Sequence, residues 1–145
     1  MKFIPMLRQN LKSDDMLDLL ETYDMEVIYE FDRTHENMPD EYCTKCLELG
    51  LQLVFDADQH LKTIFINLTD ADGFTPTDLA DSDVLHFSLK KNAASYALQE
   101  GVATSEGRAE FLGVERDWIR LEYEGYSVHY EYRQGSLALV TVASK

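Results

Sequence analysis

The stretch LELGLQLVF, residues 47–55, alternates between apolar and other side chains over most of its length. Such a period of two is typical of a β-strand with one buried face. After the short polar stretch DADQH, the segment LKTIFINL, residues 61–68, is again rich in branched and aromatic residues. The two segments are therefore predicted to form a β-hairpin. The predicted buried face of its first strand holds Leu47, Leu49, Leu51, Leu53 and Phe55.

A similar pattern lies 75 residues further along the chain. GLQLVFD, residues 50–56, aligns with GYSVHYE, residues 125–131, so that Gly50 meets Gly125. If the turn of the second hairpin holds one extra residue, Ile64 aligns with Val140. Each half then contains one helix and three strands, which predicts an α+β fold of two αβββ repeats with antiparallel β-meanders packed against helices. We expect a single domain, 1–145, with repeats at about 13–68 and 84–142 and an acidic linker at about 69–83.

The two predicted helices have recognisable end signals. Ser13 is a good N-cap, and Asp14 and Asp15 follow it near the positive end of the helix dipole. We therefore predict a helix over about 13–22. Ser88 is the corresponding cap expected for the second helix, and Gly101 is expected to end it.

The charge of the chain is strongly unbalanced. Its 145 residues include 27 acidic and 13 basic side chains, which gives a formal net charge of −14. Nucleic acids and anionic membranes are poor partners for such a surface, because phosphate groups need clustered Lys and Arg. The excess of acid favours either simple solubility or a basic protein partner. The N-terminus lacks the apolar core of a signal peptide, so we expect the protein to be cytoplasmic.

Cys43 and Cys46 form a C-x-x-C and are the only cysteines. A zinc site needs four ligands, and neither a second C-x-x-C nor a close pair of histidines is present. A thioredoxin-like site would place the pair at a helix N-terminus, whereas here it runs into a predicted strand. The favoured interpretation is two reduced packing residues, with metal binding and redox chemistry left as alternatives.

Motifs for catalysis and for cofactors are missing from the sequence. There is no G-x-S-x-G, no G-x-G-x-x-G, no P-loop and no H-E-x-x-H. The acidic stretch TDADGFTPTD, residues 69–78, has Asp70 and Asp72 at the first positions of a calcium loop. It lacks the glycine and the glutamate that such a loop requires. We therefore predict a protein without catalytic activity, metal or cofactor.

The sequence resembles small cytosolic bacterial proteins that accompany polymorphic and contact-dependent toxins. Those proteins have a tyrosine, then a Gly–apolar–x–apolar–x–Phe strand, an L-x-x-I-F strand, a helix that ends in glycine and a C-terminal hairpin. The Leu-Gly-x-Pro that often ends their second helix is only partly matched here by QEGVA, residues 99–103. The matching positions are Tyr42, Gly50, Phe55, Leu61, Ile64, Phe65, Gly101, Trp118, Tyr126, Tyr130 and Val140.

This resemblance implies an immunity protein, which binds and neutralises a cognate toxin by direct contact. The toxin expected for such an acidic chain is a basic, nuclease-type effector domain. An acidic secretion chaperone or adaptor is the alternative, although we expect such chaperones to close with a helix. A metal or redox protein built on the C-x-x-C is the third possibility. The oligomeric state, monomer or weak dimer, stays open.

The expected toxin contacts lie in two acidic segments that are predicted to be exposed. The choice is based on charge and exposure, and solvated loops without a partner are the competing interpretation. The predicted toxin-binding residues are Glu36, Asp40, Glu41, Asp70, Asp72, Asp78, Asp81 and Asp83.

Overall fold

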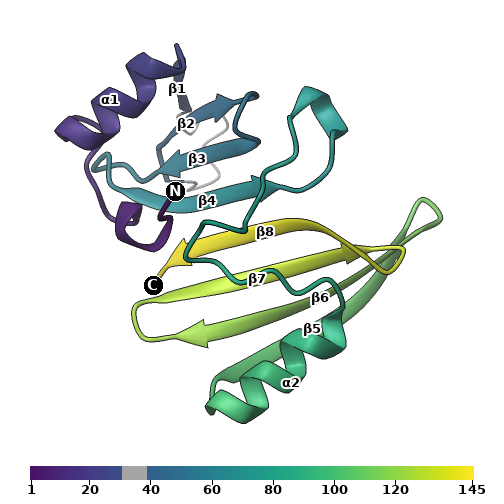
Figure 1. Cartoon of the computed structure of the whole chain (residues 1–145). Coiled ribbons are helices and arrows are strands. Elements are labelled where there is room, and N and C mark those ends of the chain that lie inside the picture. Colours follow the sequence, from purple (N-terminus) through teal and green to yellow (C-terminus); the bar gives the residue numbers. More distant parts are fainter. Residues whose placement is uncertain (31–38) are drawn as a thin grey trace.

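The computed structural model describes residues 1–30 and 39–145, and its strands form one eight-stranded antiparallel sheet (Figure 1). The strand order is β1-β2-β3-β4-β8-β7-β6-β5. The strands are β1 (Val27–Glu30), β2 (Glu41–Cys46), β3 (Leu51–Phe55), β4 (Leu61–Asn67), β5 (Ala103–Phe111), β6 (Val114–Tyr123), β7 (Tyr126–Arg133) and β8 (Ser136–Ser144). The helices are η1 (Ile4–Met6), α1 (Asp14–Thr22), η2 (Ala71–Gly73) and α2 (Lys90–Glu100).

Two four-stranded meanders meet at the centre of this sheet. The first runs inward from β1 to β4, and the second runs inward from β5 to β8. β4 and β8 pair antiparallel, so that Ile64 lies opposite Val142 and Ile66 lies opposite Val140. All four of these side chains are buried. The seam between the two meanders is thus part of the hydrophobic core.

The core lies on one face of the sheet. It combines alternate residues of the central strands, such as Leu53 and Tyr130, with Met16 of α1 and Ala97 of α2. The segment between β4 and α2 crosses this face as an extended chain (Figure 1). It contributes the buried side chains Phe74, Leu79 and Val84.

The predicted fold of two αβββ units packed against helices is wrong. The strands form a single sheet of eight, the helices are short, and each meander has four strands rather than three. One reason is Gly50, whose φ of +71° bends the chain between β2 and β3. The alternation over residues 47–55 therefore spans a turn and a strand, and Leu47 is half exposed. The other reason is β5, a strand too polar to be recognised from its sequence.

Two of the three predicted helix-end signals are confirmed. The Ser13 side chain accepts a hydrogen bond from the backbone N–H of Met16, so the prediction for α1 is confirmed. Gly101 ends α2 in the left-handed conformation, as predicted. Ser88 is not the cap of α2, because the helix begins one residue later and Leu89 occupies that position. Among the described residues, no helix is long and apolar enough to cross a membrane.

Candidate functional site: an acidic cleft

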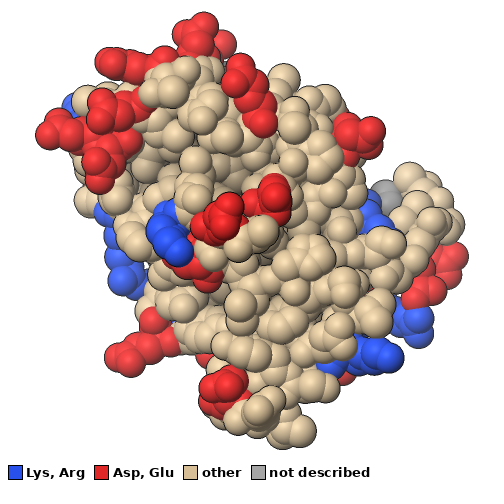
Figure 2. All heavy atoms as spheres, in the orientation of Figure 1, with Lys and Arg blue, Asp and Glu red and all other residues tan. Residues whose placement is uncertain are grey.

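The negative charge is concentrated in the first part of the chain. Residues 1–89 hold 19 acidic and 6 basic side chains, whereas residues 90–145 hold 8 acidic and 7 basic ones. Figure 2 shows acidic side chains gathered around α1, at the upper left of the molecule. No basic residue lies between Lys12 and Arg33, or between Lys62 and Lys90. These segments therefore contribute a net negative charge to the surface of the first part of the chain.

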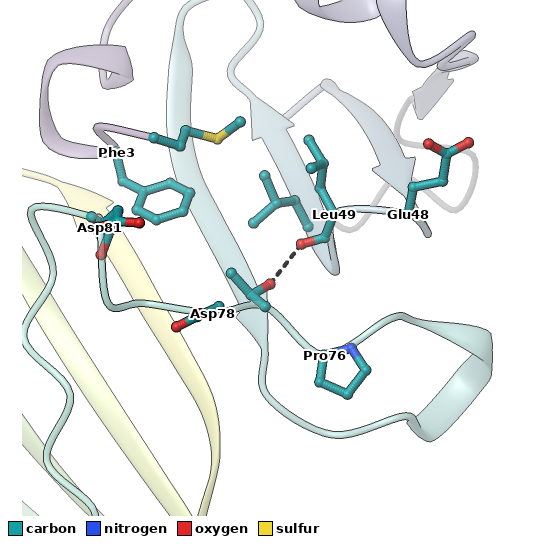
Figure 3. A pocket seen from close by; sticks show the side chains of 10 residues that line it. Phe3, Glu48, Leu49, Pro76, Asp78 and Asp81 are labelled. Atoms are coloured by element: carbon teal, nitrogen blue, oxygen red, sulfur yellow. Dashed lines mark hydrogen bonds between the residues drawn. The ribbon is translucent and has the colours of Figure 1, made fainter.

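A cleft opens within this acidic part of the molecule (Figure 3). It has a volume of about 180 Å³ and lies between the N-terminal segment, the β2–β3 turn and the segment that follows η2. Its apolar walls and floor come from Met1, Phe3, Leu49, Leu51 and Pro76, and the acidic residues of its lining are Glu48, Asp78 and Asp81. The carboxylate of Glu48 points away from those of Asp78 and Asp81, which lie on the side of Phe3 (Figure 3).

Backbone hydrogen bonds hold the segment after η2 against the β2–β3 turn. Thr75 N–H donates to the carbonyl of Leu47 at 2.8 Å, and Thr77 N–H donates to the carbonyl of Asn67 at 2.8 Å. The Thr77 hydroxyl donates to the carbonyl of Leu49 at 2.6 Å, which is the dashed line in Figure 3. Gly50 permits this close approach, because a Cβ at its position would lie 2.3 Å from the carbonyl oxygen of Thr75. One side of the cleft is therefore built by specific contacts.

The other side of the cleft is held by Asp83. Its two carboxylate oxygens accept hydrogen bonds from the backbone N–H groups of Phe3 at 2.7 Å and Ile4 at 3.0 Å. These bonds fix the N-terminal segment beside the acidic segment, and they bury the ring of Phe3. Asp83 thus has a structural role in forming the cleft.

The composition of the cleft suits a long basic side chain. Lys and Arg carry an apolar stem and a charged head, so an apolar floor with a carboxylate rim matches both parts. Glu48, Asp78 and Asp81 are exposed, so each carboxylate is accessible to a partner. The Asp78 carboxylate also accepts a hydrogen bond from Ala80 N–H at 2.9 Å, which holds it in place.

The structure brings together only some of the predicted contact residues. Asp78 and Asp81 both line the cleft, whereas Asp70 and Asp72 are exposed at η2, outside its lining. Glu48 was missed, because the alternation of residues 47–55 placed it on the polar face of a strand. No local signal connects Glu48 with Asp78, because the two are 30 residues apart.

The remaining predicted contacts are engaged within the chain or lie outside the described residues. The Asp40 carboxylate accepts a hydrogen bond from the Tyr29 hydroxyl at 2.6 Å. Glu41 forms an ion pair with Lys62 at 2.6 Å. Glu36 lies outside the described residues. Asp40 and Glu41 are thus less available to a partner than the carboxylates of the cleft.

The two cysteines lie on opposite faces of β2. Cys43 pairs with Val54 and Cys46 with Leu51, and residues three apart on a strand point to opposite faces. Their Cα atoms are about 10 Å apart in an extended strand, beyond the reach of a disulfide. Burial raises the pKa of the Cys43 thiol, and the carboxylates of Glu30 and Glu41 add to this effect. The pair therefore offers no shared metal site, and Cys43 is not an activated thiolate.

One other group of possible metal ligands occurs among the described residues. Asp56, Asp58 and His60 lie close together in the β3–β4 turn. Asp56 Oδ1 already accepts hydrogen bonds from Asp58 N–H at 3.0 Å and His60 N–H at 2.9 Å. These bonds are typical of a tight polar turn, so the group is explained by the local structure.

Aromatic residues of the second meander mainly serve the core. The Tyr132 hydroxyl donates to the carbonyl of Phe87 at 2.7 Å, and Tyr132 is buried. Trp118 stacks on His129, with ring centroids 5.1 Å apart, on the face of the sheet opposite the core. Burial lowers the pKa of His129 and raises the pKa of Tyr123 to about 12. These residues are neutral at pH 7, so none is poised as a charged acid or base.

Comparison of the chain with protein-family models, with curated proteins and with solved structures found no match.

Proposed function

We propose that this protein is an immunity protein, which binds a basic toxin domain through the acidic cleft and thereby neutralises it. The observation that carries the proposal is the pair Asp78 and Asp81 at the rim of a cleft with an apolar floor. The sequence resemblance to immunity proteins supplies the biological role.

Two physical arguments support a basic protein as the partner. Residues 1–89 carry a surplus of 13 acidic side chains, so their field attracts a cation from beyond contact distance. Within contact distance, the cleft has the size and chemistry to take one Lys or Arg side chain as an anchor. Long-range steering speeds association, and the anchor slows dissociation.

Neutralisation in this proposal needs no chemistry from the immunity protein. Nuclease-type toxins use Lys and Arg to contact phosphate groups, and a cleft that takes up such a side chain competes with the nucleic acid. The partner class is therefore a folded domain with an exposed basic patch.

The test is binding and growth protection with the toxin domain encoded next to this chain. The double variant Asp78→Asn with Asp81→Asn removes two charges from the cleft. We expect it to raise the Kd at least about tenfold, because charged contacts at an interface centre are worth about 2 kcal/mol or more. Growth protection should decrease in parallel.

The matched control is Asp70→Asn with Asp72→Asn, which removes the same charge at η2, outside the cleft. This variant should change the Kd less than about threefold, and mainly through the association rate. Equal losses of affinity in both variants would show that only the net charge matters. That result would reject the cleft as the binding site. A neighbouring toxin domain that neither binds nor is neutralised would reject the immunity function.

A further inference from the structure

The sheet ends at β5, and β5 pairs with β6 alone in the part of the chain that the structure describes. Its nine residues present an edge of unpaired N–H and C=O groups, which can bond to another strand. We propose that two copies of this chain pair through their β5 edges, antiparallel, about a twofold axis at Gly107. The sheet then continues from one copy into the other.

The charges on β5 complement themselves in this register. Around Gly107, Glu106 of one copy lies opposite Arg108 of the second copy, and the symmetry axis repeats the pair. Both side chains are exposed and lie on the same face of the sheet, because they are two residues apart. Opposite charges directly across an antiparallel pair are favourable, whereas like charges are not.

The alternative registers are poorer. Pairing centred on Glu106 or on Arg108 places that charge opposite its own copy. Pairing centred on Ala109 matches Arg108 with Glu110, but it uses only residues 107–111 of the strand. Gly107 is the middle residue of Ala103–Phe111, so the proposed register pairs the whole strand. Charges on an edge usually prevent pairing, and here their alternating signs select one arrangement.

The same register bears on an exposed leucine of the β5–β6 turn. Leu112 is 87% exposed. In the proposed register, Leu112 of one copy lies opposite Val102 of the other, just beyond the paired strands. Pairing therefore gives this apolar side chain a protein neighbour in place of water.

The test is the association state of the full chain by sedimentation equilibrium, with charge variants. The unchanged protein is expected to form a dimer as its concentration rises. Arg108→Glu and Glu106→Arg each place like charges opposite one another twice, so each alone should raise the dimer Kd at least about tenfold. An equimolar mixture of these two variants restores both opposite-charge pairs and should form a heterodimer.

Glu110→Lys is the matched control, because Glu110 lies opposite Thr104 in the proposed register. It should leave the dimer Kd within about threefold of the unchanged protein. Thermal unfolding of each variant checks that it is folded, since Arg108 also forms an exposed ion pair with Glu115. The proposal fails if the unchanged chain stays monomeric, if the mixture stays monomeric, or if Glu110→Lys dissociates the dimer as strongly as Arg108→Glu.

Discussion

The two halves of the sheet build similar meanders but use their charges differently. In residues 90–145, charged side chains pair with one another: Lys90 with Asp117 at 2.6 Å, and Arg133 with Glu131 at 2.8 Å, for example. In the described part of residues 1–89, Lys62 with Glu41 is the one ion pair that involves Lys or Arg. The second half pairs most of its basic side chains with its own carboxylates, whereas the first half leaves a surplus of carboxylates for a partner.

The halves also differ in what holds them together. Strands β5–β8 have eight to ten residues, whereas β1–β3 have four to six. Short strands form few ladder bonds, and the first half gains additional bonds from segments outside the sheet. Thr77 bonds to the β2–β3 turn, and Asp83 bonds to the N-terminal segment. The stability of the first half therefore depends more on its loops. These loops also form the acidic cleft.

The largest effect is expected at Gly50, where this dependence is strongest. Gly50→Ala forces a left-handed φ of +71° on a residue with a Cβ, and that Cβ would overlap the carbonyl of Thr75. We expect a loss of about 3 kcal/mol or more in the free energy of unfolding, measured by denaturant titration.

Gly135, in the β7–β8 turn, provides the control for Gly50. Its φ is +82°, but no atom lies within 4 Å of the added Cβ. Gly135→Ala should cost about 1 kcal/mol, from the backbone conformation alone. Equal losses at the two positions would mean that packing of the segment after η2 contributes nothing to the first half.

An intermediate effect is expected from the buried tyrosine hydroxyls of the second half. Tyr132→Phe removes the bond to the carbonyl of Phe87 and leaves this carbonyl without its partner. The expected loss is about 1–2 kcal/mol in the free energy of unfolding. Tyr29→Phe, at an exposed tyrosine of the first half, should cost less than about 0.5 kcal/mol, because water replaces the lost bond. The reverse order would contradict the assignment of the core to this face.

The smallest effect is expected at Glu122, a partly buried residue of β6. The ammonium group of Lys145 lies 2.9 Å from its carboxylate and lowers the pKa of Glu122. A carboxyl group with a lowered folded pKa stabilises the protein above its unfolded pKa of about 4.3, and this contribution is lost as the pH falls. Glu122→Gln should therefore lower the Tm slightly at pH 7, and the difference should shrink as the pH falls below the unfolded pKa and through the folded pKa of Glu122.

Glu124→Gln is the control for Glu122. Glu124 is exposed and forms no ion pair with the described residues, so its replacement should leave the Tm unchanged at both pH values. A Tm of Glu124→Gln that follows the same pH dependence as that of Glu122→Gln would exclude the specific pair with Lys145.

Some elements of the fold could be predicted from local patterns. The hairpin of β3 and β4, the cap of α1 at Ser13 and the end of α2 at Gly101 all depend on neighbouring residues. β2 and β5 could not be recognised, because the first contains polar residues among its cysteines and the second is mostly polar. Such strands form because a neighbouring strand offers hydrogen bonds, and this information is not local.

The sequence predicted exposed acidic contacts but not the cleft. Charge alone indicated Asp78 and Asp81, and the structure places both at the rim. Charge could not separate them from Asp83, whose carboxylate holds the N-terminal segment. Glu48 joins the lining of the cleft through contacts such as that of Thr77 with Leu49, between segments 28 residues apart.

The sequence by itself determined the acidic surplus and its concentration in residues 1–89, the hairpin turns and the ends of the two helices. Each of these follows from composition or from residues close together in the chain. Only the tertiary structure decided that β4 pairs with β8, that the two meanders share one sheet, and which carboxylates face a cleft. These features depend on backbone hydrogen bonds and packing between distant segments, which no local pattern of side chains encodes.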